Sequence, residues 1–452
     1  MTPTSQAAAA ACERTIRTIQ ADERVPAMAA AVARADRPHW SIYLGDAGGG
    51  EPVAPETQFR IGSVTKTFTA ALVLQLRDAG MLDLDDPLDV HLALPAHGQL
   101  TIRSVLNHTS GLQREPWGNV WDTLDVPDDD RLLDEVAKAE AVLTPRRRWH
   151  YSNLGFAMLG HLVAARTGGT WEEALVERLL TPLGLADTTV AARPPVAQGY
   201  LVDAYSDYAR PEPHFDLRGA APAAQLWSTA GDMAKWALFL AEPDPAVLAR
   251  STLEEMFEPV VVTDPVDWHT GWGLGLMAAP QGGADRAVDI GHNGAMPGFL
   301  AGVWCRRGVR IGAAVLGSSG VAGGITKAPH KLIAASLEHD PIDVEPWTIG
   351  APVPPDYVEL LGRWWSEGNE FVFRWRHGHL EAKGDDDAES APPAVFAFEG
   401  RDLLRTVSGR EAGERLELFR GPDGQVVEMR WATYRVTRDQ RTYGGTGWRG
   451  GR

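Results

Sequence analysis

Apolar residues recur at helical spacing along several stretches of the chain. From residue 64 to about 79, Phe68, Leu72 and Leu76 form one stripe, and Gly80 stands where a C-terminal cap is expected. A stretch this apolar predicts a long, buried helix. Similar spacing, or a capping residue before an apolar run, predicts further helices at residues 5–22, 101–106, 128–140, 154–166, 171–180, 230–241 and 324–338.

Strand-like patterns lie on both sides of this helical region. Residues 25–32 and 39–44 are predicted to form two strands joined by a turn at 36–38, and strand-like runs return between 272 and 316. Strands near both ends, with helices between them, indicate one sheet assembled from distant parts of the sequence.

The C-terminal part of the chain has a different pattern. A proline-rich linker spans residues 341–355, and beyond it short strands with turns between them are predicted at 371–375, 395–398, 416–419 and 426–431. The sequence therefore predicts a first domain at residues 1–340, the linker, and an all-β module at 356–452 that forms a small antiparallel barrel.

Composition supports a folded protein with two domains. A chain of 452 residues exceeds a single ordinary core, and 44% hydrophobic and 23% charged residues are typical of globular proteins. The net charge of −17 argues against nucleic acid or an anionic membrane as partner. No apolar run approaches the roughly 18 residues of a membrane span, and the N-terminus lacks the basic segment of a secretory signal, so a cytoplasmic location is expected. Cys12 and Cys305 are too few for a disulfide framework.

Ser63 and Lys66 are the first candidates for chemistry. Three residues apart at the start of the predicted helix, they share one face, so the Lys66 amine lies within reach of the Ser63 hydroxyl. The chain has only six lysines and fifteen serines, so a chance Ser-x-x-Lys is expected about 0.2 times. The alternative is that Ser63 only caps the helix. A lysine one turn into a buried helix favours proton transfer with the serine.

Three motifs stand in order along the chain: Ser63-x-x-Lys66, Tyr151-x-Asn153 and His292-Asn293-Gly294. With the flanking segments 106–112, 151–156 and 182–185, the chain resembles the serine hydrolase family of class C β-lactamases, D-alanyl-D-alanine peptidases, D-aminopeptidases and β-lactamase-fold esterases. The resemblance covers about residues 15–338. It implies an α+β, β-lactamase/transpeptidase-like fold, with an antiparallel sheet flanked by helices and an all-helical region. The module after it resembles the lipocalin-like domains of some members.

The resemblance also implies roles for these residues. Ser63 would be the nucleophile that forms an acyl-enzyme, and either Lys66 or Tyr151 would act as its general base. Asn153 would bind the substrate amide or carbonyl, together with the segment His292, Asn293 and Gly294. The backbone N–H groups of Ser63 and Ala295 would form the oxyanion hole. The resemblance implies neither a metal ion nor a cofactor.

The third motif departs from the β-lactamase pattern, which has Lys-Thr-Gly where this chain has His292-Asn293-Gly294. A histidine is largely neutral at pH 7 and shorter than lysine, so it holds a β-lactam carboxylate less well. We therefore expect hydrolysis of esters or small D-amino-acid amides and peptides, with weak activity on β-lactams.

The sequence leaves two alternative functions within the same fold. They are a non-catalytic protein that binds β-lactams or peptidoglycan fragments, and a true class C-like β-lactamase. The chain has no Gly-x-Ser-x-Gly elbow and no His-Glu-x-x-His motif, which argues against an α/β-hydrolase and a zinc hydrolase. The expected partner is a small-molecule substrate, and the patterns leave the oligomeric state open.

Overall fold

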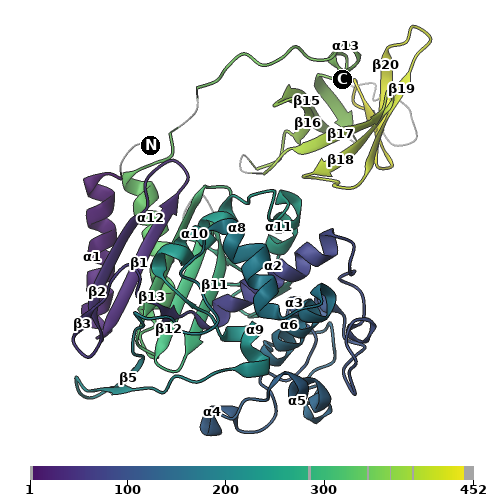
Figure 1. Cartoon of the computed structure of the whole chain (residues 1–452). Helices are drawn as coiled ribbons and strands as arrows, with labels where there is room; N and C mark the ends of the chain where they lie inside the picture. Colours follow the sequence, from purple (N-terminus) through teal and green to yellow (C-terminus); the bar gives the residue numbers. More distant parts are fainter. Residues whose placement is uncertain (1–3, 283–286, 344–345, 367, 389–390, 442–452) are drawn as a thin grey trace. The chain divides into compact units, whose positions relative to one another are not determined.

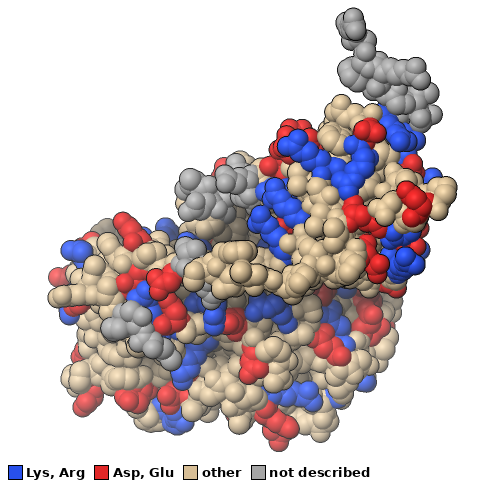
Figure 2. All heavy atoms as spheres, turned by 90° about the horizontal axis from the view of Figure 1, so that it is seen from above, with Lys and Arg blue, Asp and Glu red and all other residues tan. Residues whose placement is uncertain are grey.

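The computed structural model describes residues 4–282, 287–343, 346–366, 368–388 and 391–441. The chain divides into two compact units, Met1–Ile342 and Asp343–Arg452. Within the described residues, no helix is both long enough and apolar enough to cross a membrane. Acidic and basic side chains are interspersed over the face of the molecule shown in Figure 2.

A nine-stranded antiparallel sheet forms the centre of the first unit (Figure 1), in the order β3-β2-β1-β13-β12-β11-β10-β9-β8. The N-terminal strand β1 pairs with β13 near the end of the unit, so that Ala30 lies opposite Val315. This pairing confirms that one sheet is assembled from distant parts of the sequence. The strands are β1 (Ala27–Arg34), β2 (Trp40–Gly48), β3 (Glu51–Pro52), β8 (Val261–Val262), β9 (Gly271–Trp272), β10 (Met277–Pro280), β11 (Val288–Met296), β12 (Phe299–Arg306) and β13 (Ile311–Gly317).

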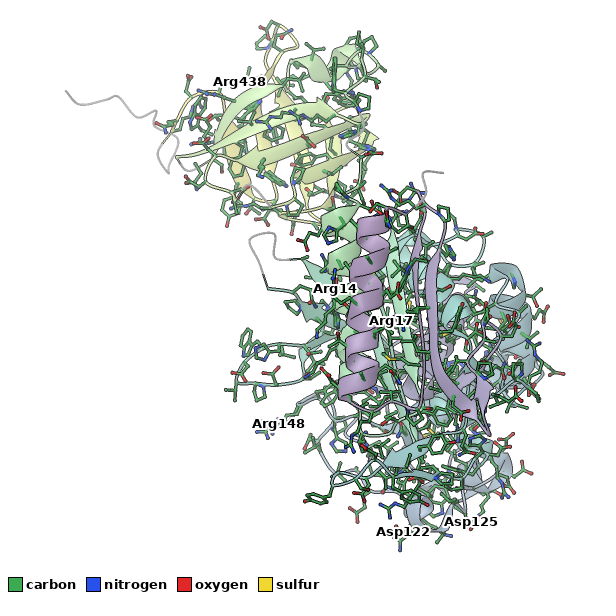
Figure 3. All side chains as sticks on the ribbon, turned by 90° about the vertical axis from the view of Figure 1, so that its left-hand side faces the viewer. Arg14, Arg17, Asp122, Asp125, Arg148 and Arg438 are labelled. Atoms are coloured by element: carbon green, nitrogen blue, oxygen red, sulfur yellow. The ribbon has the colours of Figure 1, made fainter. Side chains whose placement is uncertain are left out.

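Helices cover both faces of this sheet. On one face, α1 (Gln6–Asp22) and α12 (Gly324–His339) bury Ile16 and Leu332 against the sheet, while Arg14 and Arg17 lie on the outer side of α1 (Figure 3). Strand β1 is buried on both faces, because its alternate residues belong to two different hydrophobic cores. An alanine-rich strand fits between two layers of helices because its side chains are small.

The other face carries α10 (Ala230–Ala241) and the all-helical region, whose central helix is α2 (Thr65–Asp78). Nearly every side chain of α2 is buried, and Gly80 follows it with a positive φ of 69°, as its apolar pattern predicts. The remaining helices are α3 (Ile102–Leu106), α4 (Val120–Thr123), α5 (Asp129–Asp134), α6 (Asn153–Thr167), α7 (Trp171–Leu175), α8 (Thr181–Leu183), α9 (Ala221–Ala224) and α11 (Arg250–Phe257). Short two-stranded sheets pair β4 (Phe59–Arg60) with β7 (Trp227–Ser228), and β5 (Tyr200–Val202) with β6 (Ala209–Pro211).

Two predicted elements differ in the structure. The helix expected at 128–140 is shorter, since α5 ends at Asp134 and a single 3₁₀ turn follows at Val136–Lys138. The strand-like pattern expected from residue 272 onward is interrupted at once, since β9 ends at Trp272 and the chain turns at Gly275 with a φ of 76°. A Cβ on Gly275 would lie 2.4 Å from Cβ of Ala70, so the turn also packs closely against α2.

The second unit is a closed barrel of eight antiparallel strands in sequence order, which confirms the predicted barrel. Its interior is filled by aromatic side chains such as Trp364, Phe373, Phe396 and Trp431. Four of its strands coincide with predicted ones, and β14, β16, β18 and β21 were not predicted. The helix α13 (Pro355–Val358) precedes β14 (Gly362–Ser366), β15 (Asn369–Arg376), β16 (His379–Gly384), β17 (Ala394–Gly400), β18 (Leu403–Ser408), β19 (Arg415–Arg420), β20 (Val426–Trp431) and β21 (Tyr434–Thr437).

Candidate active site

Ser63 lies in a 3₁₀ turn, η1 (Gly62–Val64), that leads directly into α2. Neither η1 nor α2 has a side-chain cap, so Ser63 does not serve as a helix cap. Gly62 has a φ of 52°, and a Cβ there would lie 2.7 Å from the backbone N and 2.8 Å from the backbone O of Ala295. Glycine is therefore required just before Ser63, and it allows β11 to approach the serine closely.

Lys66 is completely buried and makes three polar contacts. Its Nζ lies 2.6 Å from Oδ1 of Asn153, 2.8 Å from the carbonyl O of Ala223 and 3.2 Å from Oγ of Ser63. Burial lowers the pKa of Lys66 well below that of a free lysine, and the nearby Glu115 carboxylate offsets part of this effect. A neutral amine has two N–H groups and one lone pair. In a neutral Lys66, the two carbonyl oxygens would accept both hydrogens and would leave the lone pair for the Ser63 hydroxyl.

Tyr151 and Asn153 are positioned by the start of α6. Ser152 caps this helix by accepting a hydrogen bond from the N–H of Gly155 at 3.0 Å, and so fixes the residues on either side of it. Burial raises the pKa of Tyr151 above that of a free tyrosine, and a hydrogen bond with the Ser63 side chain opposes this effect. Tyr151 is therefore a neutral phenol at pH 7, in contact with the candidate nucleophile.

The third motif lies inside β11, beyond the end of the pairing between β10 and β11 at Gly291. A Cβ on Gly294 would lie 1.9 Å from the backbone O of Ile61 and 3.4 Å from the backbone N of Ser63. The backbone N atoms of Ser63 and Ala295 therefore both lie at the close contact between residues 61–63 and β11, where the oxyanion hole is expected.

His292 is buried on the side of the sheet that faces Tyr151, with 6.4 Å between the two ring centroids. Its Nδ1 donates to the carbonyl O of Asn293, so in the neutral ring Nε2 carries no proton. Burial is the main cause that lowers the pKa of His292 to about 3. His292 is therefore neutral at pH 7.

Asn293 is not brought together with the other candidates. Its Oδ1 accepts a hydrogen bond from the indole N–H of Trp304 at 2.9 Å, and Trp304 belongs to the core under α1 and α12. Alternate residues of a strand point to opposite faces, so the side chain of Asn293 points away from the face that carries His292.

Two neighbours of Tyr151 and Asn153 were not among the predicted site residues. His108, fully buried, lies with its ring 4.3 Å from the ring of Tyr151, and its Nδ1 accepts the N–H of Ser152 at 3.1 Å. Glu115 accepts a hydrogen bond from Nδ2 of Asn153 at 2.7 Å. This bond orients the amide so that Oδ1 points to Lys66. His108 is part of the flanking segment 106–112, whereas no sequence signal marked Glu115.

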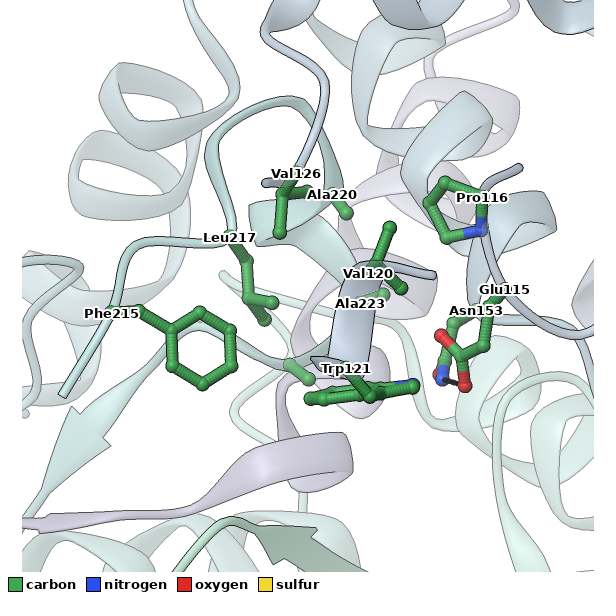
Figure 4. A pocket seen from close by; sticks show the side chains of 11 residues that line it. Glu115, Pro116, Val120, Trp121, Val126, Asn153, Phe215, Leu217, Ala220 and Ala223 are labelled. Carbon is green, nitrogen blue, oxygen red and sulfur yellow. Dashed lines mark hydrogen bonds between the residues drawn. The ribbon is translucent and has the colours of Figure 1, made fainter. Parts of the chain in front are cut away.

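A small apolar pocket that is partly open to solvent adjoins Asn153 (Figure 4). Among the residues that line the pocket, Glu115 has a carboxylate. Ala223, whose carbonyl O accepts a hydrogen bond from Lys66, also lines the pocket. The rest of the lining is formed by Pro116, Val120, Trp121, Val126, Phe215, Leu217, Ala220 and Ala224.

One group of side chains has the spacing of metal ligands, within the part of the chain that the structure describes. Asp264, Asp267 and His269 lie in the loop between β8 and β9, with ligand atoms within 4.8 Å of one another. Asp264 already accepts three backbone N–H groups of its own loop, from residues 267 to 269. Because local turn bonding accounts for the arrangement, we assign no metal to it.

The fold and the site together define the class of protein. An antiparallel sheet flanked by helices, with Ser-x-x-Lys at the start of the central buried helix, is the arrangement of serine hydrolases with the β-lactamase fold. The sequence model of the family described as Beta-lactamase matches residues 12–336, and the chain belongs to this family. A second model, described as Domain of unknown function (DUF7586), matches residues 353–438.

Individual relatives agree with this assignment. Penicillin-binding protein 4 of Amycolatopsis lactamdurans is 32% identical over 61% of this chain and 76% of its own length. The structure of SurE is 26% identical with a TM-score of 0.62, covering 96% of this chain and 99% of SurE. A D-stereospecific amidohydrolase from Streptomyces sp. is 27% identical with a TM-score of 0.59, covering 71% of this chain and 98% of that one. The chain spans about half the length of two other curated relatives, 51% and 48%.

Proposed function

We propose that this protein is a serine hydrolase that cleaves esters or small D-amino-acid amides and peptides through an acyl-enzyme on Ser63. The hydrogen-bond arrangement of Lys66 carries the proposal: two carbonyl oxygens accept its N–H groups at 2.6 and 2.8 Å, and Ser63 Oγ lies 3.2 Å away. Burial favours the neutral amine, so Lys66 is the general base, and Tyr151 is protonated before the attack.

The reaction then follows in two halves. As Ser63 Oγ attacks the carbonyl carbon, its proton moves to Nζ of Lys66, and the oxyanion is stabilised by the N–H groups of Ser63 and Ala295. The Tyr151 hydroxyl, hydrogen-bonded to Ser63, passes a proton to the leaving group as its bond to the carbonyl carbon breaks. In the second half, water gives a proton to the Tyr151 phenolate as it attacks the acyl-enzyme, and Lys66 returns its proton to Ser63 Oγ as the bond to the acyl group breaks.

The pocket beside Asn153 supports substrates with an apolar acyl side chain. Glu115 at its edge supplies a carboxylate that suits an ammonium group on the same acyl unit, as in an amide or ester of a free amino acid. Two relatives agree with this class by their names: the D-stereospecific amidohydrolase, and SurE, which is also described with D-Leu at 25% identity.

Turnover of a β-lactam is expected to be weak. His292 has no charge at pH 7, since its pKa is lowered to about 3, so it attracts no β-lactam carboxylate. We expect kcat/KM for nitrocefin at least about ten-fold below that for the best p-nitrophenyl ester, which corresponds to roughly 1.4 kcal/mol. Parallel kinetics on the two substrates check this, and comparable values would contradict it.

Labelling with a fluorophosphonate probe tests the proposed function. We expect the wild type to gain one covalent adduct in its intact mass, and Ser63→Ala to gain none. Ser110→Ala is a matched control, because Ser110 is also buried but lies outside the site, and it should label like the wild type. Labelling that survives Ser63→Ala, or a wild type that neither labels nor hydrolyses any ester or amide, would contradict the proposal.

A further inference from the structure

Arg60 is a buried cation three residues before Ser63, in β4. Its side chain is 1% exposed, and no described carboxylate lies within ion-pair distance of it, although the charge of Asp216 partly offsets the effect of burial on its pKa. Nη2 donates to Oε1 of Gln225 at 3.1 Å, whereas Nε and Nη1 make no hydrogen bond within the described part of the chain. Burial lowers the pKa of Arg60 to about 10, so it is still charged at pH 7.

An arginine in such surroundings does not stabilise the fold. A buried charge without a counter-ion in contact with it is unfavourable, and even complete buried ion pairs can often be replaced by apolar residues of similar size without loss of stability. Arg34 in β1 is the ordinary case in this chain: it is also buried, but its guanidinium forms two hydrogen bonds of 2.8 Å with the carboxylate of Asp36. The side chain of Arg60 therefore calls for another explanation.

The contacts of Arg60 lead to the wall of the apolar pocket. Its guanidinium carbon lies 5.2 Å from the ring centroid of Phe215 and 5.5 Å from that of Trp227, both within the range of cation–π attraction. Oε1 of Gln225, which binds Arg60, also accepts the backbone N–H of Leu217 at 3.0 Å. Phe215 and Leu217 both line the pocket beside Asn153 (Figure 4).

We propose that Arg60 is a positioning residue that holds the Phe215–Leu217 wall and thereby sets the preference for bulky over small acyl groups. This inference rests on the proposed function, because it assigns the pocket to the acyl group. Arg60 acts on the ring of Phe215 directly and on the backbone of Leu217 through Gln225. It joins β4, which ends three residues before the nucleophile, to the segment that shapes the pocket.

Two esters with the same leaving group measure this role. The selectivity ratio is kcat/KM for p-nitrophenyl phenylacetate divided by kcat/KM for p-nitrophenyl acetate. We expect Arg60→Met to lower this ratio at least ten-fold without lowering Tm, and Arg60→Lys, which keeps the charge beside both rings, to restore part of it. Arg34→Met is the matched control: it should lower Tm, because it removes the hydrogen bonds of Arg34 to the carboxylate of Asp36 and to the carbonyl O of Asp340, and it should keep the wild-type ratio.

The result that overturns the inference is an unchanged ratio in Arg60→Met, or a lower Tm with an unchanged ratio, which marks a merely structural residue. If Arg60→Met fails to fold, Phe215→Leu decides, since an unchanged ratio there shows that the wall does not select the acyl group. Calorimetry measures the same preference without turnover. The ligands are D-phenylalanine amide and D-alanine amide, and the proteins are Ser63→Ala and the double variant of Ser63→Ala with Arg60→Met. Failure of the proposed function itself would give a different result, because the wild type would then show no hydrolysis that depends on Ser63.

Discussion

Replacing Lys66 by arginine is expected to lower kcat/KM for the best ester about 10³-fold, within the usual range for loss of a general base. Arginine places a fixed positive charge near Ser63, but its guanidinium does not lose its proton in proteins and has no lone pair to offer. The substitution therefore separates proton transfer from electrostatic attraction. Lys235→Arg is the matched control, because that lysine is 43% exposed and pairs with Asp232 at 3.0 Å.

The pH dependence of the wild type gives a second test of the same base. Only the neutral amine of Lys66 accepts a proton, so kcat/KM should rise with pH as Lys66 deprotonates. Burial lowers the pKa of Lys66, so the rise should be centred well below the ordinary lysine value of 10.5, and Lys66→Arg should remove it. Retention of more than about a tenth of the activity in Lys66→Arg would contradict a base role, since general-base effects exceed ten-fold.

The parts of this protein that depend on local sequence were predictable. Ser63 and Lys66 meet because residues three apart at a helix start share one face, and the apolar stripe of α2 located that helix. Tyr151 and Asn153 were instead predicted from the resemblance to the serine hydrolase family, because their approach to Ser63 depends on packing between helices far apart in sequence. The α+β fold followed from the same motifs.

Other features depend on contacts that no local pattern encodes. Glu115 is identified as part of the site only by its hydrogen bond to Asn153 in the structure. Arg60 is identified only by its burial beside Phe215 and Trp227. Asn293 is next to His292 in sequence, but the alternation of a strand places its side chain on the other face of the sheet. The position of each of these side chains is set by tertiary packing.

Gly294→Ala is expected to lower kcat about 100-fold with little change in KM, a loss comparable to that of one oxyanion-hole donor. The new Cβ would lie 1.9 Å from the backbone O of Ile61, so β11 must move away from η1. That movement takes the N–H of Ala295 away from the position of the oxyanion, while the apolar pocket is built from other segments and keeps its shape. Steady-state kinetics, together with the rate of fluorophosphonate labelling, measure the effect.

The matched control for this substitution is Gly291→Ala in the same strand. Its Cβ would lie 2.1 Å from the backbone O of Val303 in β12, so it strains β11 as severely but does so away from Ser63. We expect Gly291→Ala to lower Tm and to leave the kcat of the folded protein within a few-fold of the wild type. If both alanine variants lose activity equally, general distortion of the strand explains the loss. If Gly294→Ala stays within two-fold of the wild type, the contact between β11 and η1 does not form the oxyanion hole, because the donor would have moved without consequence.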